Sequence, residues 1–534
     1  SYYVGDASVY LFGKNGEAPN DSILYKNLNI HYYDKLQVRP NMLYRWMNYQ
    51  QFVRSKQMRA SNRTRLYSQY RQEQVQEKLS QLGIFSYMDM QYAPRDTTAA
   101  CDTLDVTMQA TFAKPLDAEL ELNVVTKSND QTGPGASFGV TRNNVFGGGE
   151  SWNVKLKGSY EWQTGGGEKS SLMNSWEMGL STSLTFPRVV FPHLGKREFD
   201  FPATTTFRLY INQLNRAKYY KLLSFGGNAT YDFQPSRTSR HSITPFKLTF
   251  NVLQHQSEDF KEIAEANPAL YVSLRNQFIP AMEYTYTYDN ASGRRIKNPI
   301  WWQSTVTSAG NITSLIYRAF GKPFNEEDKS LLGAPFAQFV KLNTELRHLW
   351  NIDKNNAIAS RMAVGALFTY GNATIAPYSE QFYVGGANSI RAFTVRSVGP
   401  GGYHPEEGKY SYLDQTGTFR FEANVEYRFR IFKSFWGATF LDAGNVWLLR
   451  KDRKLLADGK EARPNSQLRL KTFPKQIALG TGVGIRYDMD ILVFRLDFGI
   501  PLHLPYDTER SGYYNVTGAF FKNLGIHFAI GYPF

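Results

Sequence analysis

The chain has 534 residues, of which 15% are aromatic, with a formal net charge of +14 at pH 7 and a mean hydropathy of −0.43. It contains no run of about 20 apolar residues, which excludes a membrane-spanning helix. Its single cysteine, Cys101, excludes a disulfide framework and a multi-cysteine metal site. The basic residues are spread along the chain without a nucleic-acid-binding signature, so anionic lipid headgroups or an acidic partner account for the charge better than nucleic acid. Because no secretory signal precedes Ser1, we expect that a signal has been removed or that the chain is part of a longer precursor.

Residues 1–116 are predicted to form a small α+β domain, because strand-like and helix-like segments follow one another there. The segments LSQLGIFSYMDM and DTLDVTMQATFA, in this order, resemble a POTRA domain, the periplasmic module of outer-membrane assembly proteins. Another kind of small α+β domain is the alternative. The expected elements are strands at 2–12 and 24–33, a helix opened by Pro40, a helix over about 64–82 that ends at Gly83, and strands at 85–92 and 104–112.

From about Glu119 onward the hydrophobic pattern changes to a period of two. Between Phe419 and Ile431, apolar side chains alternate with six ionisable or amide ones. A polar lumen suits these groups better than the dry core of a soluble β-sandwich, where they would lack partners. We therefore predict a transmembrane β-barrel over residues 117–534, built from about sixteen antiparallel strands. The strands are expected to begin near residues 119, 135, 151, 174, 205, 221, 245, 278, 300, 336, 357, 417, 435, 476, 491 and 524.

The longest predicted connection, 371–416, contains the stretch YVGGANSIRAFTVRSVGP. A connection of this length is usually functional or disordered. Its composition favours order, because two adjacent glycines permit a tight backbone path, apolar residues are available for packing, and an arginine would need charged partners if buried. The alternative is a surface loop with a Gly-Gly turn. The residues of interest are Gly385, Gly386, Ile390, Arg391, Ala392 and Phe393.

Three motifs give the chain a wider resemblance. GGANSIRAF at 385–393 resembles a sixth-loop motif, FLDAGNVW at 440–447 a strand motif with an inward aspartate, and NNVFGGGE at 143–150 a turn after the second barrel strand. Together with the barrel pattern and the amino-terminal domain, they resemble the BamA/TamA superfamily of outer-membrane protein assembly factors. The usual Arg-Gly-Phe core of the loop motif is Arg-Ala-Phe here, with Ala392 in place of the glycine.

The resemblance implies that the loop folds back into the lumen and that its arginine pairs with acidic residues on the wall. Carried over to this chain, Arg391 would meet Glu426 and Asp442. A planar guanidinium removed from water needs carboxylate partners, and the alternation independently points Glu426 inward. Such a contact would either rigidify and plug the barrel or form a moving part.

The resemblance also implies insertion of client β-barrel proteins without an energy source. The first barrel strand, 119–126, would pair with the last, 524–534, and an edge at this seam would template client strands by β-augmentation. The terminal aromatic residue, expected on the lipid face, resembles the carboxy-terminal signal of outer-membrane barrels. The seam residues are Leu120, Leu122 and Val124 on the first strand, with Ile526, Phe528, Ile530 and Phe534 on the last.

Within the superfamily, the loop sequence SIRAFTVRSVGPGGY resembles that of TamA-like proteins more than that of BamA. TamA is the barrel component of the translocation and assembly module. This implies an outer-membrane location with the amino-terminal domain in the periplasm, contact with outer-membrane lipids and unfolded β-barrel clients, and a TamB-like periplasmic partner that docks through residues 1–116. The alternatives are BamA itself, a two-partner secretion transporter or a passive porin. An enzyme is not expected, since no H-E-x-x-H motif is present, and no catalytic residue, metal or cofactor is predicted.

Overall fold

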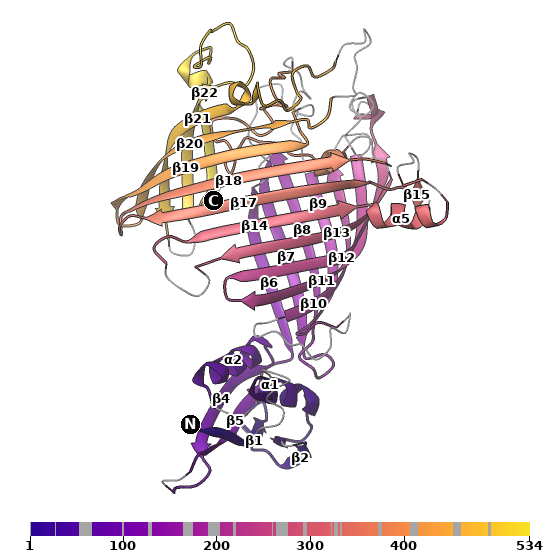
Figure 1. The fold of residues 1–534 in the computed structure, drawn as a ribbon, viewed down its shortest axis with the longest axis vertical. Helices are drawn as coiled ribbons and strands as arrows, with labels where there is room; N and C mark the ends of the chain where they lie inside the picture. The colour runs from indigo at the N-terminus through magenta and orange to yellow at the C-terminus, as the bar shows by residue number, and fades with distance from the viewer. Residues whose placement is uncertain are drawn as a thin grey trace.

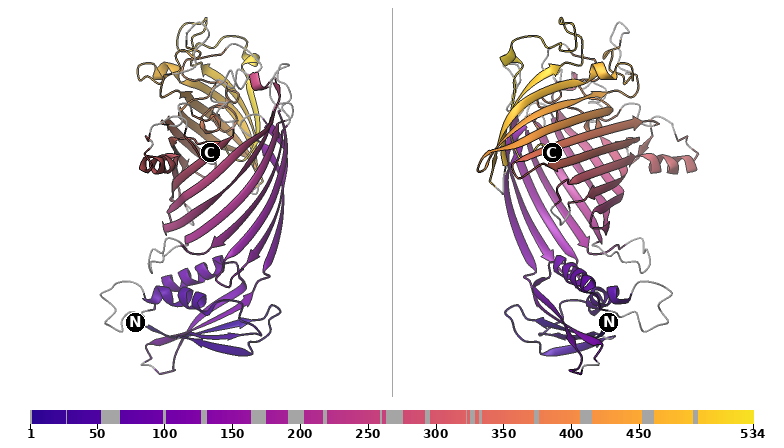
Figure 2. Two further views of the ribbon diagram at one scale, coloured as in Figure 1. Left: turned by 90° about the vertical axis from the view of Figure 1, so that its right-hand side faces the viewer. Right: turned by 60° about the vertical axis from the view of Figure 1, so that its left-hand side comes forward.

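The computed structural model consists of a five-stranded sheet with two helices, followed by a sixteen-stranded sheet that curls into a barrel (Figure 1). Figure 2 shows the amino-terminal domain below one end of the barrel, with its helices on the side that faces the barrel. We call the opposite end of the barrel its distal end. The structure describes residues 2–26, 28–52, 67–98, 101–126, 131–163, 175–190, 203–216, 220–258, 260–262, 276–291, 296–321, 323–324, 329–331, 334–371, 376–405, 415–451, 461–489 and 493–534.

The amino-terminal sheet is mixed, with strand order β2-β3-β1-β5-β4 and β1 parallel to both of its neighbours. Its core consists of side chains from the strands and from the inner faces of both helices. Fully buried members, each 0% exposed, include Val9, Leu11, Ile30, Leu43, Leu79 and Met108. The elements are β1 (Tyr3–Phe12), β2 (Asp21–Tyr25), β3 (Leu28–Tyr32), α1 (Pro40–Phe52), α2 (Gln69–Gln81), β4 (Phe85–Pro94) and β5 (Thr103–Phe112).

Two predictions for this domain need correction. The expected single strand at 24–33 is wrong, because the chain turns at Lys26, whose φ of 56° is left-handed, and β2 and β3 form an antiparallel hairpin. The second helix begins at Gln69 rather than near residue 64, and the start expected for it lies outside the described residues. Its end is as expected, with Gly83 in the left-handed conformation that favours glycine (φ 65°).

The barrel has the sixteen strands that the period-two pattern predicts, and each pairs with its neighbours in antiparallel register. The largest displacement is at β12, which begins at Ser239 rather than near 245. The strands are β6 (Leu116–Thr126), β7 (Gln131–Asn143), β8 (Ser151–Gln163), β9 (Ser175–Phe186), β10 (Ala203–Arg216), β11 (Tyr220–Ser236), β12 (Ser239–Gln256), β13 (Gln277–Asp289), β14 (Ile300–Ala309), β17 (Phe339–Asn351), β18 (Asn356–Thr369), β19 (Phe419–Phe432), β20 (Phe435–Trp447), β21 (Ala478–Asp488), β22 (Val493–His503) and β23 (Gly525–Ile530).

The two faces of the barrel wall differ as the alternation requires. On β19, Glu422 and Glu426 are buried inside, whereas Val425 and Ile431 are about half exposed on the outer face. Among the described residues, no helix is both long and apolar enough to cross a membrane. The connection between β14 and β17 contains a helix, α5 (Asn311–Ala319), and the short strands β15 (Ser330–Leu331) and β16 (Ala334–Pro335).

The amino-terminal domain and the barrel are joined by hydrogen bonds as well as by the covalent chain. The turn that carries the NNVFGGGE motif follows β7 and reaches the segment before α1, where Arg39 N donates to Gly147 O at 2.6 Å and Asn144 Nδ2 donates to Gln37 O at 2.7 Å. Gly147 and Gly149 have positive φ angles of 78° and 83°, which this tight turn requires. The motif therefore joins the two parts of the molecule.

The predicted pairing of the first and last barrel strands is not formed among the described residues. Strands β6 and β23 are the two ends of the sheet, so each has a neighbour on one side only. The last strand is also shorter than predicted, because Gly531 adopts a φ of 87° and the chain leaves the ladder there.

Beyond Gly531 the chain turns toward the lumen. The guanidinium carbon of Arg428, an inward side chain, lies 4.3 Å from the centre of the Tyr532 ring and 5.8 Å from that of Phe534. Arg428 Nη2 also donates to Phe534 O at 3.3 Å. The lipid-facing position expected for Phe534 is therefore wrong, because the left-handed glycine redirects the final residues.

Candidate functional site: a loop folded into the lumen

The 371–416 connection enters the barrel and packs against the inner wall. Ile390 and Val384 are 0% exposed, and they belong to one cluster with wall residues such as Phe339 and Val446. The alternative of a surface loop is thereby excluded for this stretch. A compact apolar contact of this kind fixes the position of the polar groups beside it.

The two adjacent glycines shape the tip of the loop. Gly385 has a φ of 105°, and a Cβ at this position would lie 2.1 Å from Thr394 O. Gly386 has a φ of 93°, and its N–H donates to Phe393 O at 2.8 Å, which closes the reversal. Only glycine combines this backbone conformation with so close an approach.

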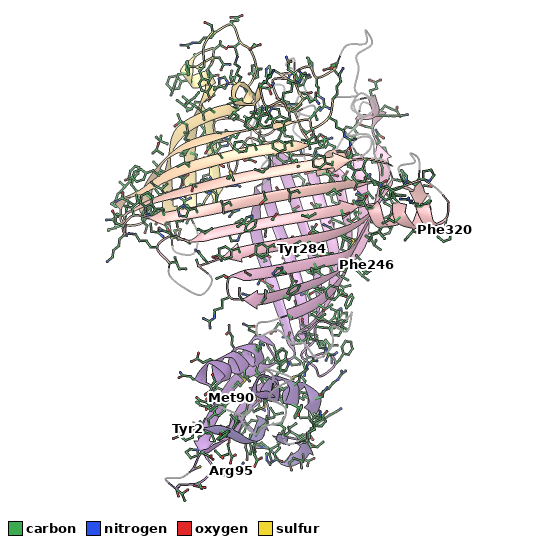
Figure 3. The ribbon with its side chains drawn as sticks, in the orientation of Figure 1. Tyr2, Met90, Arg95, Phe246, Tyr284 and Phe320 are labelled. Carbon is green, nitrogen blue, oxygen red and sulfur yellow. The ribbon has the colours of Figure 1, made fainter. Side chains whose placement is uncertain are left out.

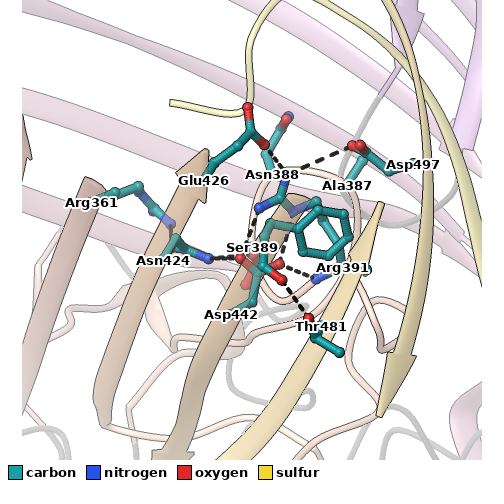
Figure 4. A network of polar contacts seen from close by, with 12 residues as sticks. Arg361, Ala387, Asn388, Ser389, Arg391, Asn424, Glu426, Asp442, Thr481 and Asp497 are labelled. Carbon is teal, nitrogen blue, oxygen red and sulfur yellow. Dashed lines mark hydrogen bonds and ion pairs between the residues drawn. The ribbon is translucent and has the colours of Figure 1, made fainter. Parts of the chain in front are cut away.

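Arg391 lies at the centre of the site and is 0% exposed (Figure 4). Its Nε donates to Asp442 Oδ2 at 2.8 Å and its Nη2 to Asp442 Oδ1 at 2.9 Å, which is a bidentate pair. Its Nη1 contacts Glu426, and its guanidinium carbon lies 3.6 Å from the centre of the Phe440 ring. The structure thus brings Arg391 to both carboxylates that the resemblance implied, and Asp442 points inward as the resemblance also implied.

Each of the two carboxylates has further partners. Glu426 Oε2 accepts from Arg486 Nη2 at 3.0 Å, and Glu426 Oε1 accepts from Arg428 Nε at 2.7 Å. Asp442 Oδ1 accepts from Asn424 Nδ2 at 2.9 Å, and Asp442 Oδ2 accepts from the backbone N–H of Arg391 at 3.0 Å. Glu426 is therefore held by three arginines, whereas Asp442 has one arginine and two neutral donors.

Sequence reasoning missed a second clamp on the loop. Arg495 Nη1 donates to Ala387 O at 2.9 Å, its Nη2 contacts Asn388, and its Nη1 also pairs with Asp497 at 3.3 Å. On the other side Ser389 Oγ donates to Glu422 Oε2 at 2.7 Å. The alternation places Arg495 and Glu422 inside the barrel, but it carries no signal that they bind the loop.

The substitution of Ala392 for the usual glycine is accommodated by the wall. Ala392 has no positive φ, so its backbone conformation does not require glycine. A Cβ at Gly480 would lie 2.3 Å from Ala392 Cβ, and a Cβ at Gly499 would lie 2.6 Å from Arg391 O. Glycines on β21 and β22 therefore provide the space that the loop backbone and the alanine methyl group occupy.

The predicted seam residues lie on two separate edges. Leu120 and Leu122 are 68% and 76% exposed on the outer face of β6, and Ile526 and Phe528 are 59% and 62% exposed on that of β23. Val124 belongs to β6 and Ile530 pairs in register with Phe494.

A match to the G-x-S-x-G pattern, at 135–139, lies in the middle of strand β7. Ser137 Oγ there donates to Glu121 Oε2 at 3.1 Å. A nucleophile of this motif stands on a strand-to-helix turn, so this serine lacks the required geometry.

A sixteen-stranded antiparallel sheet with a polar inner face, an apolar outer face and an inserted loop defines an outer-membrane β-barrel protein. A family model described as the Omp85 superfamily domain matches residues 144–534, and the chain belongs to this superfamily. The resemblance to BamA/TamA proteins is confirmed at this level.

Solved structures with a related fold include BamA from Haemophilus ducreyi lacking POTRA domains 1–3, with a TM-score of 0.59 and 12% sequence identity over 96% of this chain and 88% of that one. CdiB from Acinetobacter baumannii matches with a TM-score of 0.44 and 12% identity over 83% of this chain and 66% of that one. CdiB from Escherichia coli matches with a TM-score of 0.41 and 12% identity over 99% and 90%. At this level of identity the likeness to BamA concerns the fold.

Proposed function

We propose that this protein is a TamA-like factor that assembles client β-barrel proteins at its open seam. The observation that carries the proposal is the pair of sheet ends, β6 and β23, which have a neighbour on one side only among the described residues. An unpaired strand edge presents a row of N–H and C=O groups that an incoming strand can complete.

Strand β6 is the better template of the two. It pairs with β7 along its whole length, from Leu116 opposite Arg142 to Thr126 opposite Thr132, and among the described residues no strand pairs with its other edge. Strand β23 spans only six residues before Gly531 turns the chain away. A client strand that pairs with β6 would extend the outer apolar face of Leu120 and Leu122, so the growing sheet would remain compatible with lipid.

The loop site is connected to the seam through the backbone. Its carbonyl group at Arg391 lies so close to β22 and β23 that a Cβ at Gly499 or Gly525 would approach within 2.6 and 3.1 Å of it. We infer that the Arg391 network holds the wall beside β23 in position while the seam accepts a client. If the loop served only to plug the barrel, its loss would affect leakage but not client assembly.

The amino-terminal domain is the proposed docking site for a TamB-like periplasmic partner. Its sheet ends in β2 and β4, which lack a neighbour on the outer side among the described residues, and Tyr87 of β4 is 58% exposed. Replacing Tyr87 by arginine should weaken co-purification of a TamB-like protein with the full chain. Unchanged co-purification would argue against docking at this edge.

Reconstitution tests the main proposal. Liposomes that contain the purified chain should fold an unfolded outer-membrane barrel client faster than empty liposomes, and Arg391→Ala should reduce the acceleration. Arg430→Ala is the matched control, because Arg430 is an exposed arginine of the same strand as Glu426 whose Nε donates to Lys433 O outside the network. No acceleration by the native chain would contradict the proposal.

A further inference from the structure

Helix α5 is attached to the outside of the barrel wall at its distal end. Gly310 lies between β14 and α5 with a φ of 70°, and a Cβ there would lie 2.2 Å from Ala337 O, so the chain reverses sharply at this point. On the return path Phe336 bridges to Phe278, which faces outward because it pairs with Phe250 on the lipid-facing side of β12. The Tyr317 ring of α5 lies 6.1 Å from that of Phe336. These contacts place the helix on the side of the wall that faces lipid.

The polarity of α5 is the reverse of that of a helix covering a water-soluble core. The exposed large apolar side chains recur at i, i+3, i+4 and i+8, which is one face of a helix. The face toward the protein is instead polar, since Thr313 and Ser314 are buried and Lys329 Nζ donates to Ser314 Oγ at 3.1 Å. The exposed large apolar residues are Ile312, Leu315, Ile316 and Phe320, at 47%, 57%, 53% and 83%.

Figure 3 shows Phe320 at the outer end of α5, away from the strands, and Figures 1 and 2 show the helix standing clear of the wall. The helix packs through Tyr317 and Phe336 on Phe278 of the outer barrel face, and the strands beside it expose Val306 and Leu342 on that same outer face. The same helix exposes one cation, Arg318, near its carboxyl end. A basic residue beside an apolar face is typical of helices that lie in the membrane interface.

We propose that α5 lies in the membrane interface of the leaflet distal to the amino-terminal domain, with its apolar face among the acyl chains. The helix thereby anchors the wall at β14 and β17 to the lipid surface and fixes the depth of this side of the barrel. The occupant of the apolar face is lipid, because the helix is attached to the apolar outer face of the barrel, which is the surface that a membrane β-barrel presents to lipid. A second copy of the chain or another protein on this face would be a different result.

Spin-label accessibility in proteoliposomes tests the inference. Cys101 is the single cysteine, so Cys101→Ser provides the background for Leu315→Cys, Ile316→Cys and Phe320→Cys, each carrying a nitroxide label. Arg318→Cys on the same helix and Tyr514→Cys in the distal connection before β23 are the controls, because both positions are exposed. Heat-modifiable mobility on a gel verifies that each labelled variant is folded.

The three labels on the apolar face should show an oxygen-to-nickel-chelate accessibility ratio several-fold above that at Tyr514, with the Arg318 label in between. Ratios on the apolar face equal to that at Tyr514 would place the helix in water and overturn the inference. Shielding from both reagents, with dipolar broadening in fully labelled protein, would indicate a protein contact and would overturn it as well.

Discussion

Replacing Arg391 by alanine should destabilise the inserted loop by about 3 kcal/mol, the lower end of the range for breaking a buried ion pair by removal of one partner. The lower end applies because the two carboxylates are affected unequally. Glu426 retains Arg428 and Arg486, whereas the donors left to Asp442 among the described residues are Asn424 Nδ2 and a backbone N–H. Most of the cost therefore arises at Asp442, which is 0% exposed.

A double-mutant cycle isolates this contribution. Arg391→Ala, Asp442→Ala and the double variant are compared by urea unfolding in detergent and by the rate of proteolysis within the loop. The bidentate contact predicts a coupling free energy of at least about 1.5 kcal/mol, because each charge-assisted hydrogen bond contributes roughly that much. Additive effects, or an Arg391→Ala cost no larger than that of Arg430→Ala, would refute the assignment of Asp442 as the principal partner.

Three further predictions follow from the geometry. Gly385→Ala should speed proteolysis of the 371–416 loop more than Gly512→Ala speeds proteolysis of the connection before β23. Both glycines have a φ near 100°, but a Cβ at Gly385 would meet Thr394 O, whereas nothing described lies within 4 Å of a Cβ at Gly512. Equal effects of the two variants would show that backbone strain alone matters and would contradict a role for the close contact. Ala392→Gly should cost about 0.5–1 kcal/mol of unfolding free energy in detergent, since it adds backbone freedom and removes a packed methyl group, and a gain in stability would contradict this. In the amino-terminal domain, the hydrogen bond from Arg95 lowers the pKa of Asp105, so this carboxylate stabilises the fold at neutral pH and the stabilisation is lost as the pH falls through its folded pKa. NMR titration of the Asp105 carboxyl should show the pKa rise in Arg95→Ala, and an unchanged pKa would refute the contact.

The strand plan follows from the sequence because a half-buried strand has a strict period of two. The alternation between Phe419 and Ile431 places all polar residues on one face of a strand and all apolar residues on the other. Glu426 therefore points inward, as predicted. The pairing of Arg391 with Asp442 came from the resemblance, since contacts between residues 51 positions apart leave no periodic signal.

The sequence does not predict features that depend on the conformation of one residue or on a backbone atom far away in the chain. Regular alternation through Phe534 predicts a long last strand, but the left-handed Gly531 ends it, and nothing in the period distinguishes this glycine from others in the strands. The clamp of Arg495 on Ala387 O depends on a main-chain acceptor, which every residue possesses. The apolar residues of helix α5 do recur at helical spacing, but the sequence carries no signal that this face points away from the protein.

Capture of a client strand at β6 tests the proposed mechanism most directly. In the Cys101→Ser background, Leu122→Cys on the open edge is compared with Leu342→Cys on β17, an outward residue of a strand with neighbours on both sides. When a client with one cysteine in its terminal strand folds in the presence of an added thiol oxidant, which takes up the two electrons, a disulfide should form with Leu122→Cys and not with Leu342→Cys. Equal capture at the two positions, or none at Leu122→Cys while the client folds at the accelerated rate, would contradict templating at the β6 edge.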